Sequence, residues 1–355
     1  MTSALSRGPV PLVDPAMAYE RPPVPAGVSL RLDANEGIPA FPVDALQLDA
    51  EVLRRYPDAR PLEAQLAQRY ALEASQVFVA AGADEVIDRC CRAFLARGST
   101  LLMAEPGFEM FPRYATLSGA STESVLWSPT AFPVRELMRR VSDQTRVIAI
   151  VSPNNPTGDV ATADDLRQVA SAAPDALVIL DHAYVEFAES DLTTLALALP
   201  NVIVVRTFSK AWGVAGCRVG YALGPTALIR PLRAAGSPFP VSSLSLAVAS
   251  ECLLNGVVRR DEYVSRIRRE RNELYRLLKS LNGAPRPSQG NFLFVELGAR
   301  SRQVHASLIQ QGVLVKQVSN KSGEPLGLRI SLPGAEDAFQ TLCAALSSVL
   351  KGERS

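Results

Sequence analysis

Two residue types that supply much of the metal and redox chemistry of proteins are scarce in this sequence. Among its 355 residues there are two histidines and five cysteines, and no two cysteines stand in CxxC spacing. Neither a zinc site nor a disulfide framework can be read from such spacing. We therefore expect no bound metal, free thiols and a reducing, cytoplasmic environment.

Three glycine motifs that mark large classes of enzymes are missing as well. The sequence contains no GxGxxG, no GxxxxGK[ST] and no GxSxG. The dinucleotide-binding, P-loop and hydrolase-elbow classes therefore lack their first requirement.

The sequence also lacks an excess of charge and a long apolar run. Lys and Arg total 37 against 36 Asp and Glu, a net charge of +1, which argues against nucleic acid or an anionic membrane as the main partner. Apolar runs such as 147–151 are far too short to span a bilayer, and the first residues contain no apolar signal-peptide core. With 47% hydrophobic residues, the chain can bury a large globular core.

Helical and strand patterns alternate along most of the chain. Helices are predicted after Tyr56-Pro57-Asp58, from Gly82 to about Arg97, and near 110–117. Between and beyond them lie short apolar runs typical of buried strands, at 77–80, 101–103, 146–151, 177–180 and 202–205. Such βαβ units predict an α/β fold with a mainly parallel central sheet flanked by helices.

The composition changes along the chain predict three regions. Residues 1–40 begin with a proline-rich, extended arm and contribute part of a smaller domain, and residues 41–240 form the large domain. Residues 241–355 begin with a mainly helical stretch from Ser242 to Leu281, interrupted near Asn255-Gly256. This last region continues into a small α+β domain, with strands predicted at 292–295 and 328–331 and helices around His305 and Phe339.

Polar residues follow four of the predicted strands. They form the segments Gly82-Ala83-Asp84, Asn154-Asn155-Pro156-Thr157-Gly158, Asp181-His182-Ala183-Tyr184 and Arg206-Thr207-Phe208-Ser209-Lys210. Ligands of open α/β sheets bind at the carboxyl ends of the strands. We therefore expect these four segments to build one site.

In this order the four segments resemble the fold-type I (class I and II) aminotransferases, which depend on pyridoxal phosphate. The most specific parts are the loop 154–158 and the segment 209–220, in which Arg218 stands eight residues after Lys210. Within that family the chain is most similar to the histidinol-phosphate aminotransferases, through the segments 32–36, 55–58, 81–85 and 328–332. The resemblance covers roughly residues 19 to 345.

The resemblance implies pyridoxal 5'-phosphate as cofactor and three catalytic residues. Lys210 is expected to hold the cofactor through its amine and to shuttle a proton. Asp181 is expected to pair with the pyridine nitrogen and keep it protonated. Tyr184, together with Asn155, is expected to hydrogen-bond the phenolic oxygen of the ring. His182 is interpreted as a buried histidine rather than a catalytic one.

The other cofactor-binding residues fall into two groups. Backbone amides at a helix start, two hydroxyls and one guanidinium are expected to hold the phosphate: Gly82, Ala83, Asp84, Thr207, Ser209 and Arg218. Phe108 is expected to stack on the pyridine ring, at a position where relatives usually have a tyrosine. Its missing hydroxyl leaves the natural substrate open.

The resemblance also implies contacts with substrate and with a second subunit. Arg329 is expected to bind the anion of the substrate. Its guanidinium presents N–H donors in a fork, which suits phosphate and carboxylate alike. Tyr19 and Asn35 resemble substrate-side residues of the histidinol-phosphate group. Tyr56 resembles a tyrosine that reaches the cofactor phosphate of the neighbouring subunit, which implies a homodimer with sites at its two-fold interface.

The function implied is transfer of an amino group from a small amine, histidinol phosphate, to 2-oxoglutarate in histidine biosynthesis. Two enzymatic alternatives keep the same site: transamination of an aromatic or other amino acid, and decarboxylation of a phosphorylated amino acid. A non-enzymatic protein that only senses pyridoxal phosphate is disfavoured, because Lys210 is present and the first thirty residues are too short and proline-rich for a helix-turn-helix domain.

Overall fold

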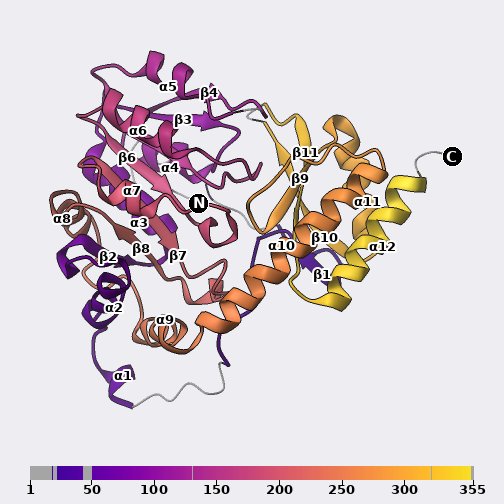
Figure 1. The fold of residues 1–355 in the computed structure, drawn as a ribbon, viewed down its shortest axis with the longest axis horizontal. Coiled ribbons are helices and arrows are strands. Elements are labelled where there is room, and N and C mark those ends of the chain that lie inside the picture. The colour runs from indigo at the N-terminus through magenta and orange to yellow at the C-terminus, as the bar shows by residue number, and fades with distance from the viewer. Residues whose placement is uncertain (1–17, 19–21, 43–49, 130, 321, 353–355) are drawn as a thin grey trace, which may run out of the picture.

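The computed structural model describes residues 18, 22–42, 50–129, 131–320 and 322–352. Most of these residues belong to two units, each built on one β-sheet (Figure 1). The strands of the larger sheet are β2 (Val77–Ala80), β3 (Thr100–Glu105), β4 (Ser121–Leu126), β5 (Thr145–Val151), β6 (Leu177–Asp181), β7 (Val202–Thr207) and β8 (Gly220–Leu223).

The larger sheet is mainly parallel, as the sequence predicted. Its strand order is β2-β8-β7-β6-β5-β3-β4. Strand β8 runs antiparallel to both of its neighbours, and the remaining pairs are parallel. The carboxyl ends of β5, β6 and β7 therefore lie side by side, and these ends carry three of the four polar segments.

Helices cover both faces of this sheet, because successive strand residues point to opposite faces. Along β5, Ile148 and Ile150 belong to one apolar cluster, whereas Val147, Ala149 and Val151 belong to another. The first cluster includes residues of α2 (Arg60–Tyr70), α5 (Val134–Arg140), α6 (Ala163–Ala172), α7 (Thr193–Leu197) and α9 (Ser243–Asn255). The second includes residues of α3 (Gly82–Phe94), α4 (Met110–Leu117) and α8 (Thr226–Ala234).

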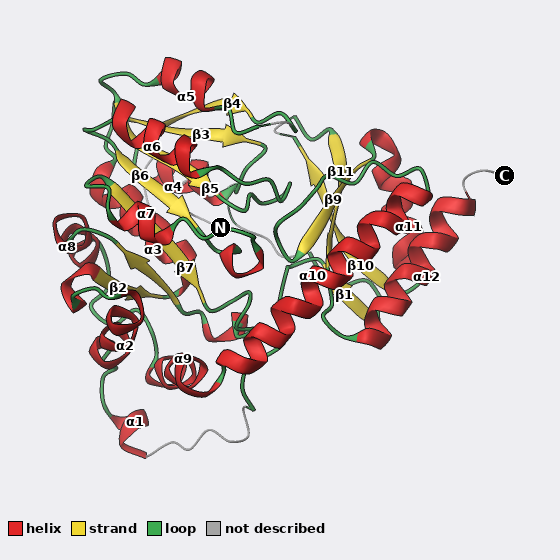
Figure 2. Cartoon of the chain, in the orientation of Figure 1, coloured by secondary structure: helices red, strands yellow, loops and turns green. Residues whose placement is uncertain are grey.

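The smaller unit takes its strands from both ends of the chain. Its sheet has the order β1-β10-β11-β9, formed by β1 (Leu30–Leu32), β9 (Phe292–Glu296), β10 (Val313–Ser319) and β11 (Pro325–Ser331). Its core also contains side chains of α10 (Val257–Ser280), α11 (Ser301–Gln310) and α12 (Glu336–Gly352). Figure 2 shows α10 as the long helix that leads from the larger unit into the smaller one.

One predicted helix ends elsewhere. Helix α3 stops at Phe94 rather than near Arg97, because Leu95 is extended and Gly98 has a φ of 85°. The Ser99 hydroxyl both accepts from the Ala96 amide and donates to the Ala96 carbonyl, which replaces the helical hydrogen bonds with a turn. By contrast, the predicted break near Asn255-Gly256 separates α9 from α10.

Among the described residues, no helix combines the length and the apolar character that crossing a bilayer requires.

Candidate active site

Lys210 lies just beyond β7, at the carboxyl edge of the larger sheet. Its Nζ donates to the Ala34 carbonyl at 3.1 Å and lies 5.6 Å from the ring centre of Tyr184. The charge of Lys210 also acts on the carboxyl of Asp181, at the end of β6. The structure thus brings together the three residues that were predicted to be catalytic.

The backbone around Lys210 is held by close packing between two segments. A Cβ at Gly37 would meet the Lys210 carbonyl oxygen at 2.1 Å, and a Cβ at Gly213, whose φ is 68°, would meet the Ile38 carbonyl oxygen at 2.0 Å. The Ala40 amide also donates to the Trp212 carbonyl at 3.0 Å. Two glycines therefore allow residues 37–40 to lie directly against the backbone that carries the lysine.

Asp181 is a buried carboxyl with a raised pKa. Its side chain accepts a hydrogen bond from the Ala183 amide at 3.0 Å, and the residue is 3% exposed. Burial raises the pKa of Asp181 to about 7, and the negative charge of Asp84 adds to the rise, whereas the Ala183 amide and Lys210 oppose it. A cationic group brought to this carboxyl would be stabilised by it.

Tyr184 is fixed by Asn35, which is itself bonded to Ser331 of the smaller sheet. The Asn35 amide nitrogen donates to the Tyr184 hydroxyl at 3.1 Å, while the Ser331 hydroxyl donates to the Asn35 amide oxygen at 2.6 Å. Asn291 donates in turn to the Asn35 carbonyl at 3.2 Å. Asn35 is 1% exposed and has a φ of 53°. The structure shows it orienting Tyr184, and its contact with substrate stays a prediction.

Arg329 and Asn155 meet across the two units. On β11, Arg329 donates from Nη1 to the Asn155 amide oxygen and from Nη2 to the Asp33 carbonyl, each at 2.7 Å. Its guanidinium also lies over the ring of Phe292, 5.7 Å from the centre. Because a guanidinium can only donate, the oxygen of the Asn155 amide must face it. The Nδ2 group of Asn155 therefore points to the other side, as a donor.

A cradle for an anion lies at the start of α3. Arg218 reaches Asp84 with Nη2 at 3.0 Å and the Ser209 hydroxyl with Nη1 at 3.4 Å, and the Thr207 hydroxyl donates to Ser209 at 3.0 Å. Gly82 has a φ of 86°, and a Cβ there would meet Arg218 Nη2 at 2.5 Å. Helix amides, two hydroxyls and a guanidinium thus converge, a donor set that fits a phosphate.

Phe108 is half-buried and packs edge-to-face on Phe111 of α4, with 6.4 Å between ring centres. Next to it, the Pro106 carbonyl accepts from the Asn154 side chain at 2.8 Å, so the loops after β3 and β5 are joined. The stacking of Phe108 on a cofactor ring stays a prediction.

His182 is buried, as expected. Burial and the charge of Arg206 lower its pKa to about 4, so the imidazole is neutral at physiological pH. Its Nδ1–H donates to the Ser152 carbonyl, which joins the ends of β5 and β6. Arg206 itself forms ion pairs with Glu186 at 2.9 Å and Asp191 at 3.0 Å.

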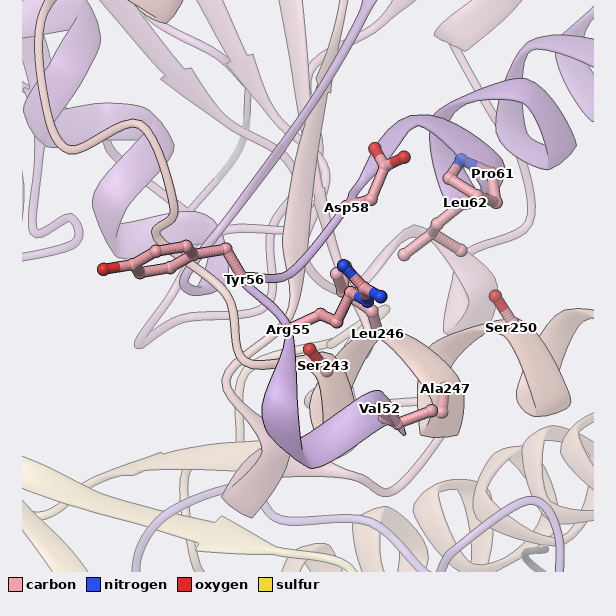
Figure 3. A pocket seen from close by; sticks show the side chains of 10 residues that line it. All are labelled: Val52, Arg55, Tyr56, Asp58, Pro61, Leu62, Ser243, Leu246, Ala247 and Ser250. Carbon is pink, nitrogen blue, oxygen red and sulfur yellow. The ribbon is translucent and has the colours of Figure 1, made fainter. Parts of the chain in front are cut away.

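One predicted residue, Tyr56, is not part of this group within one chain. Tyr56 is 82% exposed and stacks on Phe239, with 4.8 Å between ring centres. In Figure 3 its ring points away from the other side chains that line a cavity of about 270 Å³. That cavity is lined by Val52, Arg55, Tyr56, Asp58, Pro61, Leu62, Ser243, Leu246, Ala247 and Ser250. Tyr19 lies outside the described residues.

The sequence did not single out Ser331 and Asn291 as functional. Both are buried polar residues next to apolar strands, in Leu328-Arg329-Ile330-Ser331 and before Phe292-Leu293-Phe294. Buried polar groups need hydrogen-bond partners, so a serine within an apolar strand was a usable signal. The pairing of Ser331 with Asn35, 296 residues away, left no signal in the local sequence.

A glycine substitution tests the close packing around the lysine. Gly37→Ala should lower the free energy of unfolding by about 1–3 kcal/mol, because its methyl group overlaps the Lys210 carbonyl. Urea unfolding measures the loss. The matched control is Gly216→Ala, where an added Cβ meets nothing within 4 Å, and equal stability of the two variants would contradict the packing argument.

Comparisons with known proteins agree with this geometry. Residues 30–346 match the family model "Aminotransferase class I and II". Histidinol-phosphate aminotransferase 2 of Pseudomonas aeruginosa is 35% identical over 332 residues, which cover 89% of this chain and 88% of the relative. Histidinol-phosphate aminotransferase of Caldanaerobacter subterraneus subsp. tengcongensis is 33% identical over 330 residues, covering 90% and 93%.

A solved structure shares the fold over almost the full length. The crystal structure of histidinol-phosphate aminotransferase from Sinorhizobium meliloti, in complex with pyridoxal-5'-phosphate, superposes with a TM-score of 0.86 and covers 99% of both chains at 24% identity. The family match and the identity to curated relatives confirm the resemblance found in the sequence. This chain belongs to the class I and II aminotransferase family.

Proposed function

We propose that this chain is a pyridoxal-phosphate-dependent aminotransferase that takes the amino group of histidinol phosphate and passes it to a 2-oxo acid such as 2-oxoglutarate. The observation that carries the proposal is the placement of Lys210, Asp181 and Tyr184 beside an anion cradle. Family membership and the pyridoxal-5'-phosphate complex of the Sinorhizobium relative support the cofactor. The names of the curated relatives support the substrate and a place in histidine biosynthesis.

The donor set fits the cofactor group by group. The amides of residues 82–84 and the side chains of Thr207, Ser209 and Arg218 would hold its phosphate, and Asp181 would hold a proton on its ring nitrogen. Tyr184 and the Nδ2 group of Asn155 would donate to its ring oxygen, and Phe108 would cover one face of the ring. When bound, pyridoxal phosphate supplies an aldehyde for amines and a ring that withdraws electrons.

The residues of the chain then handle the protons. The Nζ of Lys210 would hold the cofactor at rest and, once free, would act as the base that takes the proton from the substrate carbon. Asn35 anchors the hydroxyl of Tyr184, whose ring centre lies 5.6 Å from the Nζ of Lys210. Because Asp181 is buried, its carboxylate would attract the protonated ring nitrogen more strongly than an exposed carboxylate would.

The raised pKa of Asp181 gives a pH dependence for cofactor binding. Only the ionised carboxylate stabilises a protonated ring nitrogen, so the affinity of the apoenzyme for pyridoxal phosphate should rise as the pH passes upward through about 7. Asp181→Asn should bind the cofactor about tenfold or more weakly and lose this rise. Fluorescence titrations between about pH 6 and pH 8 measure both. An unchanged pH profile in Asp181→Asn would contradict the role.

Arg329 offers a clamp for the anion of the substrate, and a clamp by itself accepts either phosphate or carboxylate. The names of the relatives favour the phosphate. Transamination of an aromatic or other amino acid, and decarboxylation of a phosphorylated amino acid, are the competing reactions at the same site. Measurement of single half-reactions distinguishes them.

Histidinol phosphate should convert the bound cofactor to its amine form much faster than histidine or phenylalanine, in single turnovers followed by absorbance. Histidinol without phosphate should lose most of that rate, because the clamp then has no anion to bind. Arg329→Lys keeps the charge but loses the fork, so kcat/KM should fall about ten- to a hundredfold. A faster reaction with a free amino acid would overturn the substrate, and carbon dioxide release would overturn transamination.

The surface around Tyr56 supports a homodimer. Large apolar side chains are exposed on α1 (Ala50–Arg54), on the loops that follow α1 and precede α9, on α9 and at the start of α10: Leu53, Tyr56, Phe239, Leu244, Leu254 and Val258. Apolar patches of this kind mark protein interfaces, and we propose that a second copy of the chain covers this one. Tyr56 would then reach the phosphate cradle of its partner.

Mixed dimers test the position of Tyr56. Tyr56→Phe should retain pyridoxal phosphate poorly, and Lys210→Ala should be inactive. When the two are mixed and reassociated, one site of each hybrid carries both defects and the other carries neither. About a quarter of all sites should then be intact, and activity should exceed that of either parent. An activity no greater than the average of the parents, or a monomer by light scattering, would contradict the dimer.

We place the enzyme in the cytoplasm. All five cysteines are free thiols in the structure, and free thiols suit a reducing compartment.

A further inference from the structure

The loop that follows β5, residues 154–159, is contacted by a segment of the smaller unit. Arg286 Nη2 lies 2.7 Å from Asp159 Oδ2, and the Gln289 amide donates to the Gly158 carbonyl at 2.8 Å. Gly158 has a φ of 84°, and a Cβ there would meet the Ser288 hydroxyl oxygen at 2.1 Å. Residues 286–289 thus contact the end of the loop through an ion pair, a hydrogen bond and close packing.

Arg286 is firmly placed for this contact. Its amide donates to the Phe294 carbonyl of β9 at 2.8 Å, and Pro285 bridges Val295 in antiparallel fashion. The side chains of Arg286 and Asp159 are 8% and 14% exposed. A buried ion pair is weakly screened by solvent and holds its partners in one arrangement. The second carboxylate near Arg286, Glu296 at 3.5 Å, is 47% exposed.

The loop transmits the position of Asp159 to Asn155, because it is closed on itself. The Asn154 amide donates to the Asp159 carbonyl and the Gly158 amide to the Asn154 carbonyl, each at 2.7 Å. The Asn154 side chain also donates to the Thr157 hydroxyl at 2.8 Å. A shift of Asp159 would therefore move the whole turn, Asn155 included.

Asn155 is in turn the residue that meets Arg329. Strand β11, which carries Arg329, is paired with β9, to which Arg286 is bonded. One sheet thus holds the loop at two places, through Arg286 at one end and Arg329 at the other.

We propose that Arg286 and Asp159 are positioning residues for the reaction. Their ion pair sets the loop 154–159 so that Asn155 meets Arg329, which orients the Asn155 donor toward the cofactor and the Arg329 fork toward the anion of the substrate. This inference rests on the proposed function. Neither residue is among those assigned above to the substrate or the cofactor.

The test removes both charges together. Removing one partner of a buried ion pair strands the other charge, whereas replacing both by neutral side chains is often close to neutral for stability. The double variant Asp159→Asn/Arg286→Met is therefore compared with wild type, with Asn155→Ala and with the triple variant. Glu296→Gln is the matched control, since it alters the exposed partner of the same arginine. Arg286→Lys keeps a donor for Asp159.

Two readouts are measured on the holoenzyme. The first is KM and kcat for the amine that wild type converts, and the double variant should raise KM about ten- to a hundredfold, with a smaller loss of kcat. The second is the pH midpoint of the absorbance of bound pyridoxal phosphate, which reports a donor to the ring oxygen and needs no substrate. It should move in the double variant in the same direction as in Asn155→Ala.

The couplings decide the inference. In the Asn155→Ala background the double substitution should change KM and the midpoint by no more than about twofold, because its effect is transmitted through Asn155. Glu296→Gln should match wild type, and Arg286→Lys should recover most of KM. Wild-type KM and midpoint in the double variant, or full additivity with Asn155→Ala, would overturn the proposal. Should the double variant not fold, Asp159→Asn/Arg286→Gln, which also removes both charges but keeps hydrogen-bonding side chains, carries the same comparison.

Failure of the proposed function would look different. Wild type would then not convert histidinol phosphate, and this result would not depend on the behaviour of any variant. The absorbance midpoints would still decide the role of Arg286 and Asp159.

Discussion

The direct packing of one backbone segment on another sets the position of the reactive lysine, and much of the site depends on it. Neither Gly37 nor Gly213 has a side chain that would hold the two backbones apart, so residues 37–40 lie against the loop that carries Lys210. The same segment supplies the carbonyl of Ala34 to Lys210 and the amide of Asn35 to Tyr184. A short stretch with little regular structure therefore holds the groups that the larger sheet alone could not fix.

The electrostatics of the site follow from what is buried beside the lysine. A carboxyl taken out of water is costly in its charged form, and burial accordingly raises the pKa of Asp181. The charge of Asp84 raises it further, although Asp84 itself is paired with Arg218 in the anion cradle. The ring nitrogen and the phosphate of pyridoxal phosphate are opposite in charge. Under the proposed function, one molecule would place its ring nitrogen at the buried carboxyl and its phosphate in the cradle.

The sequence predicted what is local and missed what is not. Continuous apolar runs gave β2, β5, β6 and β7, because strands buried on both faces leave that pattern. Strand β4 was missed, since it lies at the edge of the sheet and has only one buried residue, and β8 was missed because only the pairing with β2 and β7 makes it a strand. In the site, residues after strands could be predicted. The link from Arg329 to Asn155 joins residues 174 positions apart, and no local pattern contains it.

That long-range link also connects the two halves of the chemistry. Arg329 fixes which way the Asn155 amide faces, because its guanidinium can accept nothing. Under the proposed function, Asn155 serves the cofactor and Arg329 serves the anion of the substrate. An anion bound to Arg329 would share the guanidinium with Asn155, so binding of substrate would be felt at the ring oxygen of the cofactor. The join between the two sheets would thereby couple recognition of substrate to the electronic state of the cofactor.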